Sequence, residues 1–216
     1  MARLAINWKT VTAVAPAAVV TGQSEEESVK AQAALAERPM IVYIVSDDTT
    51  DSDVRKLEDV VFANEKMAIG TKFFDCLKIS EGNALSDRLL KETGRSAPRI
   101  VFLTRAYEET DSLEGRQISA GKLIKAMSNL VRKEYEDSFD KMCRDYTKLL
   151  NDLDRLESKR TKLAADRARL QEKPNPSREK KLERDEKELE EEIAEWNQKE
   201  KDILSFKSKG DPQTEA

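Results

Sequence analysis

The stretch Met40-Ile-Val-Tyr-Ile-Val-Ser46, followed by Asp47-Asp-Thr-Thr-Asp-Ser-Asp53, decides the fold of the first part of this 216-residue chain. Its first run is continuously apolar and rich in β-branched residues, which predicts a strand buried on both faces of a sheet. The second run is a polar turn that leads into a helix. The apolar residues of that helix share one face: Val54, Leu57, Val60 and Val61. A buried strand followed by such a helix is typical of an α/β layer.

Strands and helices continue to alternate on both sides of this stretch. We expect helices at 24–37, 54–62 and 84–92, strands at 40–46, 72–79 and 99–104, and a continuous last helix from about 120 to 173. Ser24 is suited to cap the first helix, and Gly94 is suited to close the third one in the left-handed conformation. The alternation predicts an α/β domain whose sheet is at least partly parallel.

This order of elements resembles the thioredoxin family over about residues 5–130. The most specific points are the strand-turn-helix at 40–62 and Ala97-Pro98 shortly before the apolar strand. The resemblance implies a three-layer domain in which Pro98 is cis and lies beside the turn that carries the active site in that family. It also implies a groove beside Pro98 that holds a peptide or a protein partner.

The redox chemistry of that family requires two cysteines, separated by two residues, at the N-terminus of the helix after the first central strand. The resemblance implies that Thr49 and Ser52 occupy these positions in this chain. A hydroxyl has neither the accessible anion nor the two-electron couple of a thiol, so disulfide exchange by this route is not expected. Thr and Ser also cap helices well, which is the simpler explanation of their presence.

The chain has two cysteines and no histidine. Cys76 lies within an apolar strand and is expected to be a buried small hydrophobe. Cys143 follows Met142 beside an apolar helix seam, where it either packs or crosslinks two copies of the chain. No zinc-ligand spacing is present, and the commonest metal ligand and general base is missing, so no cofactor or metal is predicted.

One calcium-binding hypothesis stays open at the acidic turn. The residues at positions 1, 3, 5, 7 and 12 of a calcium-loop template are Asp47, Thr49, Asp51, Asp53 and Glu58. However, Ser52 stands where the template requires glycine, and a strand instead of a helix precedes the loop. A solvated turn that caps its own helix is therefore favoured.

The last third of the chain carries large apolar residues spaced by seven. They are Tyr135, Met142, Leu149, Leu156, Leu163 and Leu170, with Phe139, Tyr146 and Leu153 at the intervening position, and then Leu182, Leu189, Trp196 and Ile203. Between Asn151 and Gly210, 16 Lys/Arg and 16 Asp/Glu make up 32 of 60 residues. High charge combined with heptads predicts a solvated coiled coil.

The break at Pro174-Asn175-Pro176 predicts an antiparallel hairpin within one chain, with Asn175 as the N-cap and Pro176 at the first position of the second helix. Pairing across this turn makes the numbers of opposed residues add to about 349. The expected pairs are Leu153 with Trp196, Leu156 with Ile193, and Tyr146 with Ile203, and Arg160 and Arg167 lie near Leu189, Glu186 and Leu182. The expected organisation is a thioredoxin-like domain at 1–130, a coiled-coil hairpin at 131–208 and a disordered tail at 209–216.

Function is expected to be binding or scaffolding without catalysis. Tyr135 and Phe139 form the apolar patch most available to the folded domain, a second copy or another protein. The candidate partner-binding residues are Thr49, Ser52, Pro98, Tyr135, Phe139, Tyr146 and Trp196. Two alternatives stay open: a thiol-based oxidoreductase or peroxide sensor that uses an atypical cysteine, and a chaperone-like holdase that works without ATP.

Charge and hydropathy exclude some other classes. The net charge is −4, and the predicted coiled-coil hairpin carries no basic face of the kind that binds phosphates. No nucleic-acid partner is therefore expected. The apolar stretch at 13–20 is too short to span a membrane, although it has some features of a signal peptide. We expect a cytoplasmic protein whose partner is a protein or a second copy of itself.

Overall fold

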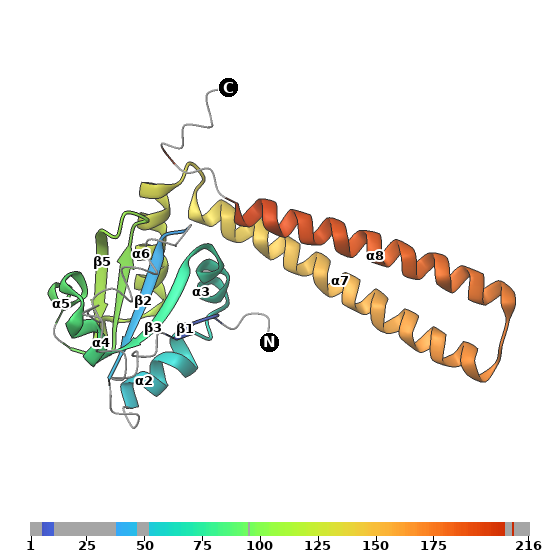
Figure 1. The fold of residues 1–216 in the computed structure, drawn as a ribbon, viewed down its shortest axis with the longest axis horizontal. Helices are drawn as coiled ribbons and strands as arrows, with labels where there is room; N and C mark the ends of the chain where they lie inside the picture. Colours follow the sequence, from blue (N-terminus) through green and yellow to red (C-terminus); the bar gives the residue numbers. More distant parts are fainter. Residues whose placement is uncertain (1–5, 11–37, 47–51, 95, 206–208, 210–216) are drawn as a thin grey trace, which may run out of the picture. The chain divides into compact units, whose positions relative to one another are not determined.

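The computed structural model describes residues 6–10, 38–46, 52–94, 96–205 and 209. The described residues form two compact units, one within 1–140 and 207–216 and the other within 141–206. Figure 1 shows a sheet with helices in the first unit and two long helices in the second. The helix predicted at 24–37 lies outside the described residues.

A five-stranded mixed sheet forms the centre of the first unit. Its strands are β1 (Lys9–Thr10), β2 (Met40–Val45), β3 (Asp75–Ser80), β4 (Arg99–Leu103) and β5 (Glu109–Glu114), in the spatial order β1-β3-β2-β4-β5. β1, β3 and β2 are parallel, whereas β4 is antiparallel to β2 and β5 is antiparallel to β4. The predicted α/β class with a partly parallel sheet is confirmed.

Short helices surround the central strands. They are α2 (Ser52–Lys56), the π-helix η3 (Leu57–Val61), α3 (Glu65–Gly70), the 3-10 helix η4 (Thr71–Phe73), α4 (Glu81–Ser86), α5 (Arg88–Glu92), the 3-10 helix η5 (Gly115–Gln117) and α6 (Ala120–Glu134). One face of β2 joins Ala84 of α4 and Leu90 of α5 in a buried cluster. On the alternate face, the ring of Tyr43 lies edge-on to that of Phe62, 5.1 Å away. Burial on both faces explains the continuous apolar sequence of β2.

Several element boundaries differ from the prediction. The strand expected from 72 begins at Asp75, because α3 and the turn η4 precede it. The helix expected at 84–92 is divided at Asp87, whose carboxylate accepts the Leu90 N–H and begins α5. Val60 is 65% exposed and does not belong to a buried helix face. Gly94 does not have a left-handed φ, so its predicted capping role is wrong.

The predicted continuous helix after 120 is also wrong, because α6 ends at Glu134 and α7 (Phe139–Glu172) begins after a short break. Ser119 caps the start of α6. Its end is capped from a distant part of the chain: the Lys209 N–H donates to the Glu134 carbonyl, 2.9 Å away, and Lys209 Nζ donates to the Arg132 carbonyl, 2.6 Å away. These bonds satisfy carbonyl groups that a helix end otherwise leaves without partners.

The second unit is an antiparallel pair of helices, most of α7 and α8 (Pro176–Leu204), as predicted. The 34 residues of α7 and the 29 of α8 correspond to lengths of about 51 and 44 Å. Asn175 caps α8 by accepting the N–H groups of Ser177 and Arg178, each 3.1 Å away. Pro176 occupies the first turn, so both predictions for the turn are confirmed.

The seam of this hairpin contains the residues that the heptad pattern selects. Its buried members are Met142, Tyr146, Leu149, Leu156 and Leu163 of α7 and Leu182, Leu189 and Trp196 of α8. The contacts between the helices lie on both sides of the expected register. The numbers of the joined residues add to 345 for Trp196 and Leu149 and to 347 for Lys159 and Glu188. Arg167 pairs with Glu186, within the neighbourhood predicted for it.

Candidate functional site

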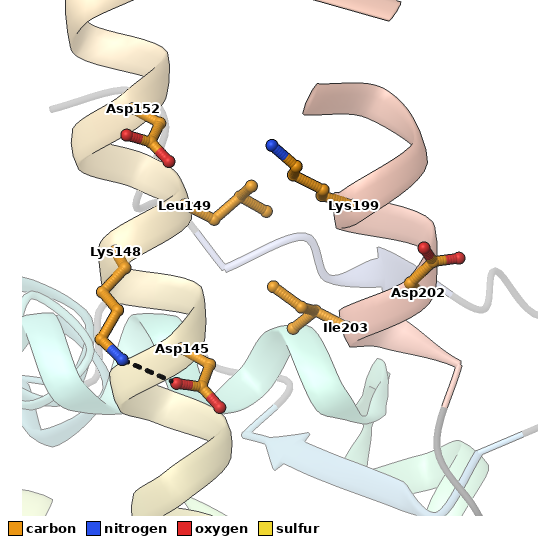
Figure 2. A pocket seen from close by; sticks show the side chains of 7 residues that line it. All are labelled: Asp145, Lys148, Leu149, Asp152, Lys199, Asp202 and Ile203. Carbon is orange, nitrogen blue, oxygen red and sulfur yellow. Dashed lines mark hydrogen bonds and ion pairs between the residues drawn. The ribbon is translucent and has the colours of Figure 1, made fainter. Parts of the chain in front are cut away.

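A groove of about 310 Å³ lies between α7 and α8, far from the turn of the hairpin (Figure 2). Its lining residues are Asp145, Lys148, Leu149 and Asp152 of α7 and Lys199, Asp202 and Ile203 of α8. Leu149 and Ile203 point toward one another between the helices, and the charged side chains surround them. The groove therefore combines an apolar floor with a rim of both signs of charge.

Two of the rim carboxylates have partners on their own helices. Asp145 accepts a hydrogen bond from Lys148 Nζ at 3.1 Å, and Asp202 accepts one from Gln198 Nε2 at 2.8 Å. Asp152 and Lys199 extend from opposite helices, and among the described contacts no ion pair joins them (Figure 2). These two side chains remain available to charged groups of another molecule. The rim residues were not predictable from the sequence, because charges that flank a heptad seam do not by themselves reveal a groove.

Two predicted partner-binding residues hold the hairpin closed. Trp196 Nε1 donates to the Leu149 carbonyl at 2.8 Å, and the Tyr146 hydroxyl donates to Glu200 Oε1 at 2.8 Å. Both aromatic side chains are buried in this structure. These hydrogen bonds lie within the chain and help to close the hairpin, and contact of the two residues with a partner stays a prediction.

Ion pairs add to this closure along one stretch of the hairpin. Lys159 Nζ lies 3.3 Å from Glu188 and 2.8 Å from Glu192, and Arg167 Nε lies 2.7 Å from Glu186. The hydrogen bond that Lys159 donates to Glu192 raises the pKa of Lys159, and the one that Arg167 donates to Glu186 lowers the pKa of Glu186. Exposed pairs of this kind stabilise weakly one by one, but they favour the antiparallel register.

Of the alternatives for Tyr135 and Phe139, the structure has contact with the folded domain, and the two residues do not form an exposed apolar patch. Both side chains are buried, and burial raises the pKa of the Tyr135 hydroxyl. A Cβ atom on Gly70 would lie 2.6 Å from Phe139 Cζ and 3.3 Å from Met127 Cε, so the Phe139 ring packs tightly on α3 and α6. These two residues belong to the core of the first unit.

Both cysteines are free and buried. The Cys76 thiol lies 3.6 Å from the Thr71 carbonyl, and burial raises its pKa to about 12. Such a thiol is protonated at neutral pH, whereas nucleophilic attack requires the thiolate. The burial of Cys143 likewise leaves little thiol surface for the crosslink that its position beside the seam suggested.

The remaining predicted site lies at the start of β4. The Ala97–Pro98 bond is cis, as the resemblance implied, and the Pro98 carbonyl accepts the Gly115 N–H at 2.9 Å. Thr49 lies outside the described residues, and so does most of the acidic turn considered for calcium. Ser52 begins α2. Among the described residues, no group of three or more His, Cys, Asp or Glu side chains is placed to hold a metal ion.

Comparisons of the chain with protein-family models, with curated proteins and with solved structures found no match. Within the described part of the chain, no helix is both long enough and apolar enough to cross a membrane. The function of this protein is therefore inferred from the geometry of its own residues.

Proposed function

We propose that this protein is a non-catalytic binding or scaffold module, in which a redox-inactive thioredoxin-like domain carries a coiled-coil hairpin for assembly. The observation that carries this proposal is the state of the thiols. Both cysteines are buried, and burial places the pKa of Cys76 far above neutral pH. Thiol chemistry requires an accessible thiolate, so the oxidoreductase and peroxide-sensor alternatives are disfavoured.

The hairpin supports a role in assembly. Its apolar seam is covered by its own second helix, and hydrogen bonds and ion pairs join the helices at several levels, including Trp196, Lys159 and Arg167. A hairpin that is closed in this way presents a semi-rigid, charged surface instead of an exposed apolar surface. Such a surface is suited to specific docking, because charge complementarity selects the partner and its orientation.

The thioredoxin-like assignment rests on the arrangement around β2. A buried strand that leads to a helix, parallel pairing with β3, and a strand that follows a cis proline and runs antiparallel to β2 all support it. Fold alone does not define function. A thioredoxin-like domain without the paired cysteines lacks the disulfide exchange of that family.

The direct test is the reduction of insulin disulfides and the turnover of peroxide by the purified full-length chain. The matched control is the double variant Cys76→Ala/Cys143→Ala, with folding checked by circular dichroism. We expect wild-type protein and variant to have the same rate, equal to that of buffer. A cysteine-dependent rate above this background would overturn the proposal.

A further inference from the structure

The charges of the hairpin are segregated along its length. Residues 160–184, which we call the turn end, contain nine Lys/Arg and four Asp/Glu, an excess of five positive charges. The nine basic residues are Arg160, Lys162, Arg167, Arg169, Lys173, Arg178, Lys180, Lys181 and Arg184, and all are exposed. The turn end is thus a basic surface on a protein whose net charge is −4, and this corrects the expectation that the helices of the last third carry no basic face.

The rest of the hairpin has the opposite charge. Residues 141–159 and 185–204, which we call the open end, contain thirteen Asp/Glu and eight Lys/Arg, an excess of five negative charges. The groove of Figure 2 belongs to the open end, and three of its five charged residues are acidic: Asp145, Asp152 and Asp202. The two ends of the hairpin are therefore equal in the magnitude of their excess charge and opposite in sign.

From this complementarity we propose that the occupant of the hairpin surface is a second copy of the chain, with the two hairpins antiparallel. This inference deepens the proposed function by naming its partner. A two-fold axis across the middle of the hairpins places each turn end on the open end of the other copy, so both complementary contacts form at once. A parallel arrangement opposes like charges at both ends and is disfavoured.

The surface is large enough for a stable contact. Two helices about 44 Å long, each about 10 Å wide, offer roughly 900 Å² per copy, which is the size of a standard interface. Exposed ion pairs alone bind weakly, and the half-buried Ile203 at the floor of the groove adds apolar contact.

A polyanionic partner complements the charge of only one end of the hairpin. A nucleic acid or an acidic membrane attracts the turn end through its phosphates, but it repels the acidic open end. A second copy matches both ends, and we therefore favour it.

The first test is the mass of the full-length chain by light scattering after size-exclusion chromatography. We expect a dimer at 50 mM NaCl and a dissociation constant at least ~10-fold weaker at 500 mM, because the screening length falls from about 14 to about 4 Å. A monomer at 50 mM salt over the micromolar range overturns the inference. It leaves the proposed function intact, since the insulin assay does not depend on self-association.

The second test reverses charge at one end at a time. The turn-end variant is Arg178→Glu/Lys181→Glu/Arg184→Glu. Its native side chains are exposed and make no described ion pair, and a glutamate at position 178 lies in the first turn of α8, where it suits the helix dipole. Circular dichroism checks that the variant is folded. The matched control is Arg116→Glu/Lys122→Glu/Lys125→Glu, three exposed residues of the first unit with the same change in charge. We expect the turn-end variant to be monomeric at 50 mM NaCl and the control to dimerise like the wild type.

The decisive step is a mixture. The open-end variant Asp152→Lys/Glu195→Lys/Asp202→Lys is also expected to be monomeric by itself. In the open-end variant both ends of the hairpin are basic, and in the turn-end variant both ends are acidic. We therefore expect the two variants to form a heterodimer when they are mixed. Failure of the mixture to associate, or wild-type dimerisation by either variant alone, would refute the antiparallel pairing.

Discussion

The indole nitrogen of Trp196 donates a hydrogen bond to the main-chain oxygen of Leu149, 2.8 Å away, and so joins α8 to α7. The Trp196 side chain is also largely buried, with 9% exposure. Trp196→Phe removes the hydrogen bond but keeps most of the apolar volume, so we expect a loss of about 1 kcal/mol in the free energy of unfolding. Trp196→Ala removes both and should cost about 3–5 kcal/mol.

Urea unfolding followed by circular dichroism at 222 nm measures both losses. Val60→Ala is a suitable control, because Val60 is 65% exposed and its truncation should change the free energy of unfolding by less than about 0.5 kcal/mol. Equal stability of Trp196→Ala and the wild type would contradict closure of the hairpin at this point.

Gly70 and Gly121 provide a matched pair of substitutions in the first unit. A methyl group on Gly70 would lie 2.6 Å from Phe139 Cζ, so Gly70→Ala should destabilise by about 1–3 kcal/mol. A methyl group on Gly121 of α6 would have no other atom within 4 Å, and Gly121→Ala should stabilise by about 0.5–1 kcal/mol. Thermal unfolding of both variants measures whether each substitution lowers or raises the stability of the protein. A loss at Gly70 that Phe139→Leu does not relieve would argue against the packing of Phe139 on α3.

Asn175 caps α8 through two main-chain N–H groups. Asn175→Ala leaves these donors without the side-chain oxygen and should cost about 1 kcal/mol, whereas Asn175→Asp retains an acceptor and should be nearly neutral. The measurement is the urea midpoint of each variant. Identical midpoints for the alanine and aspartate variants would show that the cap does not contribute to the hairpin.

The ion pairs of the hairpin predict a dependence on acid pH. Arg167 lowers the pKa of Glu186, and Lys159 lowers the pKa of Glu192. A carboxyl group whose pKa is lower in the folded state stabilises that state above its unfolded pKa, about 4.3, and this contribution is lost as the pH falls through the folded pKa. We expect the midpoint temperature to fall between pH 6 and pH 3.

The variant Glu186→Gln/Glu192→Gln isolates this contribution from that of other carboxylates. Its midpoint should fall less than that of the wild type between the two pH values, and the difference should shrink in 500 mM NaCl. Parallel pH profiles for the two proteins would show that these pairs do not stabilise the hairpin.

Periodicity made the central strand and the hairpin predictable. The run at 40–45 is apolar at every position because β2 is buried on both faces, and the spacing of seven selects the seam because only a paired helix buries such a stripe. The same spacing concealed the break between α6 and α7. Tyr135 and Phe139 are four residues apart, as in one helix, although the chain leaves the helical path between them.

Features without an apolar period were not predictable. Strand β5 has the sequence Glu-Thr-Asp-Ser-Leu-Glu at a sheet edge, and of its side chains only Leu113 is buried. Gly94 suggested a left-handed cap, but its lack of a side chain instead makes room for Glu114. The segregation of charge along the hairpin was hidden because a count over 151–210 cancels the two ends, although the order of the residues contained it.

The central claim is that this protein works by binding and not by thiol chemistry, and the alkylation rate of each cysteine tests it most directly. Folded protein at pH 7 is treated with iodoacetamide, and each site is quantified by mass spectrometry against free cysteine and against urea-unfolded protein. Because the pKa of Cys76 is raised to about 12, its thiolate fraction is about three orders of magnitude below that of free cysteine. We predict negligible labelling of both sites until the chain unfolds, whereas a cysteine that reacts faster than free cysteine in the folded protein would contradict the account.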